Sequence, residues 1–205
     1  MNPSGTYRLS FTTGSLLARE ASLAAAIFLE VGDWAAVRGQ LTEGKSLQSR
    51  TISSATRVGR ELVQRLSTLT RREVELLVDA TASERGHLMW IAACRRYALI
   101  GEFAEEVVRE RFLLMTPVLG HEEFDAFIRQ KALWHNELTE LADSTYRKLR
   151  SNLFAMLREA ELLSAEGRIV HSIPSTRVTA ALGARATADL RFFPMTDADI
   201  ERATA

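Results

Sequence analysis

Residues 141–163 read LADSTYRKLRSNLFAMLREAELL and place three cations within four positions, ahead of an apolar repeat. The cations are Arg147, Lys148 and Arg150. The apolar residues that follow recur at the spacing of one face of an α-helix. The stretch therefore predicts a helix over 144–163, whose buried stripe consists of Leu149, Leu153, Met156, Leu157 and Ala160.

The polar side chains of this predicted helix sort by their angle around its axis. With Leu153 at the centre of the buried stripe and about 100° of rotation per residue, Tyr146 returns to the core and Arg150 lies at the flank. The outward face then carries Ser144, Arg147, Lys148 and Ser151. Cations in the first turns of a helix oppose its dipole. Their position indicates contact with an anion such as phosphate, and an ordinary solvated helix face is the alternative interpretation.

The order of predicted elements around this helix matches a winged helix-turn-helix. A helix over 121–134 and a short helix over 136–142 precede a tight turn, and a β-hairpin over 164–173 follows. In that arrangement the N-terminal end of the helix after the turn enters the DNA major groove. The predicted nucleic-acid contacts of this unit are Ser144, Thr145, Arg147, Lys148, Arg150, Ser151 and Arg168.

A second basic segment lies in the N-terminal half, although the formal net charge of the chain is zero. Residues 45–72 carry seven cations against one acid, whereas residues 76–142 have a net charge of −4. A helix that begins at Ser53 presents an outward basic row, and Arg65 lies at its stripe edge, where we expect a buried stem and a paired head. The predicted contacts here are Lys45, Arg50, Ser53, Arg57 and Arg60. The loop before this helix is longer than a helix-turn-helix turn, so the match is looser.

The sparse prolines and glycines predict a mainly α fold, since the 205 residues include four prolines and eleven glycines. A long helix is expected over 84–114 with Ser83 as its cap, and a break that contains proline and glycine follows it. We expect a helical bundle in two parts. Residues 1–117 form a helix-turn-helix-like domain with the basic helix 53–68, and residues 118–205 form a winged-helix-like domain with one β-hairpin.

No arrangement of residues indicates an enzyme, a metal site or a cofactor. The chain has neither a phosphate-binding loop nor a metalloprotease motif, and its histidines are far apart: His87, His121, His135 and His171. Cys94 lies in an apolar run and is expected to be buried and inert. Other residues expected in the core include Trp34, Trp90, Leu133 and Trp134. We expect a cytoplasmic protein, since neither a signal peptide nor a membrane-spanning run is visible.

An ordered series of residues extends this interpretation over most of the chain. The series consists of Trp34, Leu47, Ser53, Arg57, Arg60, Glu61, Arg65, Leu66, Cys94, Tyr97, Phe103, Ser144, Thr145, Lys148, Leu149, Met156, Leu157, Glu159, Ala160, Ile169, Ile173 and Pro174. With these residues in this order, the chain resembles the BrxA family, a small component of BREX bacteriophage-exclusion systems. Glu161 stands where the family has a glycine in the turn before the wing. That departure predicts a longer helix or an altered entry to the wing.

The resemblance implies an all-helical, non-enzymatic protein that binds double-stranded DNA. It also implies work beside other BREX components, namely a methyltransferase, an ATPase and a phosphatase-like protein. Family members have been likened to the RNA-binding antitermination factor NusB. Two alternatives therefore remain open beside DNA binding: a protein-interaction adaptor within the BREX complex, and RNA binding in the manner of NusB.

Overall fold

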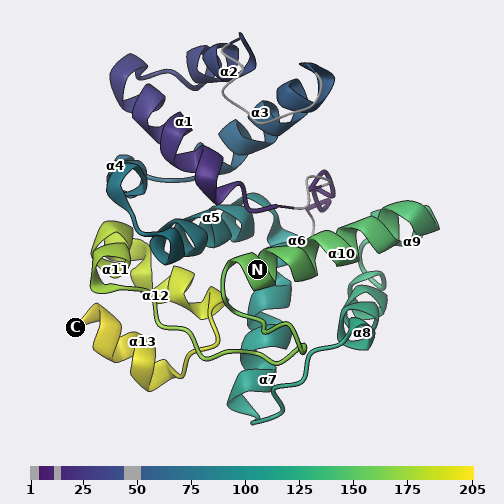
Figure 1. Cartoon of the computed structure of the whole chain (residues 1–205). Helices are drawn as coiled ribbons and strands as arrows, with labels where there is room; N and C mark the ends of the chain where they lie inside the picture. The colour runs from purple at the N-terminus through teal and green to yellow at the C-terminus, as the bar shows by residue number, and fades with distance from the viewer. Residues whose placement is uncertain (1–4, 12–14, 44–51) are drawn as a thin grey trace.

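The computed structural model describes residues 5–11, 15–43 and 52–205, and within these ranges it contains helices and no β-strand (Figure 1). The helices before residue 117 are α1 (Ala18–Val31), α2 (Trp34–Glu43), α3 (Ile52–Leu66), α4 (Arg71–Asp79), α5 (Ala82–Arg96), α6 (Ala98–Phe103), the π-helix η1 (Ala104–Arg109) and α7 (Glu110–Leu113). Those that follow are α8 (His121–Lys131), α9 (Asn136–Thr139), α10 (Asp143–Glu159), α11 (Thr176–Leu182), η2 (Gly183–Arg185), α12 (Ala186–Asp189), η3 (Leu190–Phe192) and α13 (Asp197–Thr204). The predicted mainly α class is confirmed.

Local capping chemistry sets several helix boundaries. Gly32 ends α1 with a φ of 72°, a conformation that glycine adopts without strain. The side chain of Ser175 caps α11, as its position predicts. α5 begins after Thr81, which forms a reciprocal capping box with Glu84. The expectation that Ser83 is the cap is therefore wrong, because the glutamate three residues after Thr81 completes the box there.

The long helix expected over 84–114 is interrupted, so that prediction is wrong. α5 stops before Tyr97, whose backbone is extended (φ −120°, ψ 96°), and α6 begins at the next residue. The π-helix η1 then leads into α7. Gly101 marks a close approach, as expected, because a Cβ there would lie 3.2 Å from the carbonyl oxygen of Cys94. The interruption directs the Tyr97 side chain into the core toward α3.

The segment expected to form a β-hairpin, 164–173, contains no strand. Two isolated antiparallel bridges hold it, one between Val118 and Arg168 and one between Leu163 and Ile169. Its backbone hydrogen bonds are thus divided between the chain before α8 and the chain after α10. Because neither neighbour supplies consecutive pairs, no regular ladder forms, and the hairpin is not confirmed.

Glu161 does not lengthen α10, which ends at Glu159. Glu161 instead takes the left-handed conformation with a φ of 61°. The N–H of Leu162 donates to the carbonyl oxygen of Leu157 at 2.9 Å, which closes the helix end. A glycine takes this backbone conformation without strain, so glutamate adopts it here at some energetic cost.

Helix α5 lies at the centre of the fold, between α1–α3 above it and α10 below it in Figure 1. It packs against α1, α3, α10 and α11, while α11 also packs against α4. The buried apolar side chains form one continuous cluster from Tyr7 to Ile200. Residues on both sides of the expected boundary share this core, and the division into 1–117 and 118–205 stays a prediction.

Two residues expected in the core lie on the surface. Leu133 is 73 % and Trp134 is 79 % exposed. Both lie in the turn after α8, which ends at Lys131 instead of residue 134. The helical period that pointed them inward no longer applies there. Trp90 is fully buried as expected, and Trp34 is partly buried and stacks on a phenylalanine of α1.

Candidate nucleic-acid interface

The first turns of α10 display the cations that the sequence places outward. The helix begins at Asp143 without a side-chain cap. Thr145 is half-buried, whereas the exposed outward face carries Ser144, Arg147, Lys148 and Ser151. Within the described ranges, no carboxylate lies within ion-pair distance of Arg147 or Lys148, and Arg147 Nε donates to the carbonyl oxygen of Asp143. Arg147 and Lys148 therefore expose positive charge that no direct ion pair among the described residues neutralises.

Arg150, at the flank of the same helix, has an acidic partner on α8. Its Nη1 lies 2.8 and 3.0 Å from the two carboxylate oxygens of Asp125. The Tyr146 hydroxyl donates to the same carboxylate at 2.6 Å, so Tyr146 points toward α8 and not toward solvent. Burial opposes ionisation of Asp125, but the hydrogen bonds from Tyr146 and Arg150 outweigh it and lower its pKa. The ion pair of Arg150 thus connects α10 to α8. Contact between Arg150 and a phosphate stays a prediction.

The start of α3 forms a second exposed basic row, made of Ser53, Arg57 and Arg60. One turn further on, Arg65 is 0 % exposed and its Nε lies 2.7 Å from Glu61 Oε1. The expected buried stem and paired head are therefore confirmed. Pairing inside the core orients α3 so that Arg57 and Arg60 face solvent.

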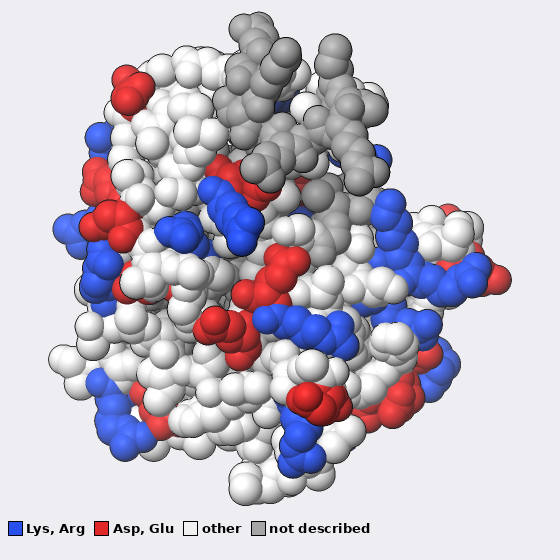
Figure 2. Space-filling model, viewed as in Figure 1, with Lys and Arg blue, Asp and Glu red and all other residues white. Residues whose placement is uncertain are grey.

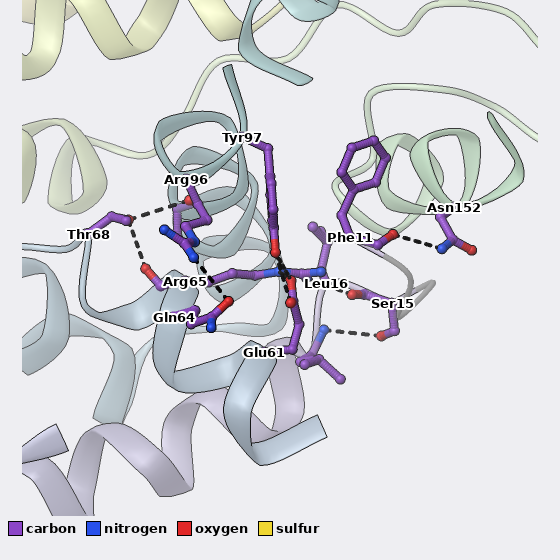
Figure 3. Close-up of polar contacts among 12 residues, drawn as sticks. Phe11, Ser15, Leu16, Glu61, Gln64, Arg65, Thr68, Arg96, Tyr97 and Asn152 are labelled. Atoms are coloured by element: carbon purple, nitrogen blue, oxygen red, sulfur yellow. Dashed lines mark hydrogen bonds and ion pairs between the residues drawn. The ribbon is translucent and has the colours of Figure 1, made fainter. Parts of the chain in front are cut away.

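The N-terminal segment connects the two basic helices, and sequence reasoning missed this role. Arg65 Nη1 donates to the carbonyl oxygen of Ser15 at 2.7 Å. The N–H of the residue after Ser15 donates to Glu159, at the end of α10, at 2.6 Å. Asn152 of α10 also donates to the carbonyl oxygen of Phe11 at 2.9 Å (Figure 3). A segment without helical periodicity carries no signal for such long-range contacts.

The remaining candidates lie elsewhere. Arg168 is exposed, and its backbone bridges to Val118 before α8. Lys45 and Arg50 lie outside the described residues. The structure thus supports exposure for most of the predicted contacts, without testing contact with nucleic acid.

The surface has positive and negative areas that are interspersed. Figure 2 shows Lys and Arg side chains at the right of the view, where Figure 1 places α9 and the start of α10, with acidic side chains close to them. The electrostatic potential near these cations, which the neighbouring acids reduce, matters more for binding a polyanion than the zero net charge of the chain does.

The described residues also bear on metal ligands, on the lone cysteine and on membrane spans. No group of three or more metal-ligating side chains occurs among those residues. Cys94 is buried as expected, and burial raises the pKa of its thiol well above its ordinary value. None of the described helices is long and apolar enough to cross a membrane.

The fold and the exposed cations define a mainly helical protein with two basic helices, both of which contact one N-terminal segment. Comparison with known proteins identifies the family. The chain belongs to the BrxA family, whose model matches residues 5–186.

Two relatives and one solved structure are similar to the chain. The BREX protein BrxA of Escherichia coli O9:H4 (strain HS) is 24 % identical over 168 residues, which cover 80 % of this chain and 79 % of that protein. The BREX protein BrxA of Paramagnetospirillum magneticum (strain AMB-1) is 25 % identical over 153 residues, covering 75 % and 77 %. The crystal structure of an uncharacterized protein from Magnetospirillum magneticum matches with a TM-score of 0.74 at 22 % identity, covering 92 % and 96 %, which shows the shared fold.

Proposed function

We propose that this protein binds double-stranded DNA as a non-enzymatic component of a BREX phage-defence system. The observation that carries the proposal is the exposure of Arg147 and Lys148 at the start of α10 without a carboxylate partner among the described residues. Arg57 and Arg60 at the start of α3 have the same character. Exposed cations of this kind bind phosphates, and phosphate contacts supply most sequence-independent affinity.

The order of α8, α9 and α10 supports a more specific binding mode. In this mode the start of α10 enters the major groove, as the second helix of a helix-turn-helix does, and the segment 164–173 lies beside it as a wing without regular strands. The two relatives named BREX protein BrxA support a place beside other BREX components. The partners are then a methyltransferase, an ATPase and a phosphatase-like protein.

A salt-titrated binding measurement on labelled duplex DNA tests the proposal. Replacing Arg147 and Lys148 together by alanine should weaken binding to all sequences and reduce the log–log salt slope by roughly 1.8, at about 0.9 per lost phosphate contact. Arg158→Ala is a suitable control, because this exposed cation lies at the opposite end of α10. Wild-type affinity and slope in the double variant would refute the proposed contact.

One observation favours a second function, that of a protein-interaction adaptor. Leu133 and Trp134 are adjacent and both largely exposed, and exposed aromatic residues are typical anchors of protein interfaces. Under this alternative, Trp134→Ser should abolish capture of other BREX proteins after nuclease treatment, and Trp134→Phe should retain it. Competition between duplex DNA and structured RNA of equal length tests the NusB-like alternative.

A further inference from the structure

A pocket of about 390 Å³ lies beside the junction of α5 and α6. The N-terminal residues Tyr7 and Arg8 form one wall, Arg95 and Arg96 form another, and His135 before α9 contributes a third. The pocket adjoins α3, because Arg96 donates to Gln64 of that helix (Figure 3). On its other side His135 directly precedes α9, the short helix before α10.

Two of the charged residues that line the pocket are neutralised by the fold. Arg95 lies between Glu73 and Asp189, with N–O distances of 2.7 and 2.6 Å. Glu102, the acid of the lining, is paired with Lys131 and accepts a hydrogen bond from the Tyr7 hydroxyl. These groups therefore add little net charge to the pocket.

Arg8 and Arg96 supply the remaining positive charge. The histidine of the lining, His135, lies 3.2 Å from Glu137, which also accepts the Tyr7 N–H. Within the described part of the chain, neither arginine has a carboxylate within ion-pair distance. Arg96 is half-buried and donates from Nη2 to the side-chain oxygen of Gln64 at 3.1 Å. Its Nε is buried and has no acceptor among the described residues. Since Nε is closed to solvent, a ligand in the pocket would meet the Nη groups of this guanidinium.

We propose that this pocket is a phosphate-binding site in which Arg96 is the principal ligand and Arg8 the second cation. The planar guanidinium can donate two parallel hydrogen bonds to phosphate oxygens, a geometry that an ammonium group cannot provide. The ring of Tyr97 lies 5.8 Å from the Arg96 guanidinium and limits its movement. After it accepts two parallel bonds from Arg96, phosphate still has an oxygen for Arg8, whereas both oxygens of a carboxylate are then used.

The phosphate has two possible sources, a nucleic-acid strand and a free nucleotide. The strand is favoured by the position of the pocket between α3 and the chain that leads to α10, and this assignment rests on the proposed function. The phosphate site itself does not rest on it, because its affinity for small phosphates is measured without DNA.

Calorimetric titration with inorganic phosphate and with AMP, at constant ionic strength, tests the site. Arg96→Gln should lower affinity for both by about tenfold or more, since the lost hydrogen bonds are charge-assisted. Arg96→Lys keeps the charge but loses the planar fork, and it should lose most of the affinity as well. Arg158→Gln should bind both ligands as the wild type does.

The proposal is overturned if wild-type protein binds phosphate no better than acetate, or if Arg96→Gln retains its affinity in a protein that melts like the wild type.

A DNA titration then identifies the source of the phosphate. If the strand supplies the phosphate, Arg96→Gln reduces the salt slope by about 0.9 and phosphate competes with duplex. If a free nucleotide supplies it, Arg96→Gln loses AMP binding but leaves the DNA salt slope unchanged. Failure of DNA binding altogether would refute the proposed function and leave the phosphate result intact.

Discussion

The hydroxyl of Tyr97 lies 2.7 and 2.8 Å from the two carboxylate oxygens of Glu61 (Figure 3). The same carboxylate pairs with Arg65, so three polar groups meet inside the core between α3 and the α5–α6 junction. Tyr97 is the residue that interrupts the expected long helix. The interruption therefore has a structural use, because it brings the hydroxyl to α3 and fixes the basic helix relative to α5.

Removing Glu61 should destabilise the protein strongly. Glu61→Ala removes the buried ion pair with Arg65 and the acceptor of the Tyr97 hydroxyl, which should lower the free energy of unfolding by about 3–5 kcal/mol. Tyr97→Phe should cost about 1.5–3 kcal/mol, the value of a hydrogen bond to a charged group. Urea unfolding measures both.

The pair of Arg71 and Glu75 provides the control, since it has the same spacing but is exposed. Glu75→Ala should change the free energy of unfolding by less than about 1 kcal/mol. Equal effects of Glu61→Ala and Glu75→Ala would contradict the role assigned to the buried network.

Glycine at position 161 should stabilise the protein. Glu161 has a φ of 61°, a conformation that costs a residue with a side chain roughly 1–2 kcal/mol. Glu161→Gly relieves that strain and loses the exposed hydrogen bond from Ser83, so the net gain should be about 1 kcal/mol. Glu161→Ala loses the same bond but keeps the strain. Thermal unfolding should rank glycine above alanine, and the reverse order would show that strain at this turn is negligible.

The basic row of α3 should contribute to DNA binding separately from α10. Replacing Arg57 and Arg60 by alanine should reduce the salt slope by roughly 1.8, at about 0.9 per phosphate, without lowering thermal stability, since both are exposed. Arg71→Ala with Arg72→Ala is the matched control, because it removes the same charge from the same basic segment but from α4. If both double variants bind equally, the general field and not contact by α3 accounts for affinity.

Stability should fall in mild acid through His87. This histidine is buried, its Nε2 lies 3.3 Å from the Ser172 hydroxyl, and its Nδ1 has no partner among the described residues. Burial lowers its pKa below the ordinary value of 6.5. The unfolded chain thus binds the proton more readily, and stability that is complete above pH 6.5 is lost as the pH falls below it.

His87→Gln should therefore show a smaller fall in melting temperature between pH 7 and pH 5 than the wild type. A comparison at pH 8 separates the packing effect of the substitution from the effect of protonation. The same pH slope in both proteins would contradict an origin in His87.

Much of the local structure could be predicted from the sequence. The helical class, the cap at Ser175 and the ends at glycines depend on residues close together in the chain. The stripe around Leu153 and the paired head of Arg65 follow from helical periodicity, because the partner of Arg65 lies one turn away on the same helix. The outward direction of Arg147 follows from that same periodicity, although the polyanion that it meets stays a proposal.

Tertiary packing decided the rest, because it depends on residues far apart in the chain. The helix that local periodicity favours is interrupted at Tyr97, whose hydroxyl donates to Glu61, 36 positions away. Arg150, which periodicity placed at the flank of its helix, forms an ion pair with Asp125 of α8. Trp134 is exposed because its helix ends early and no other element covers that turn in the described structure. Helical periodicity gives the direction of a side chain, but only the folded neighbours decide what it meets.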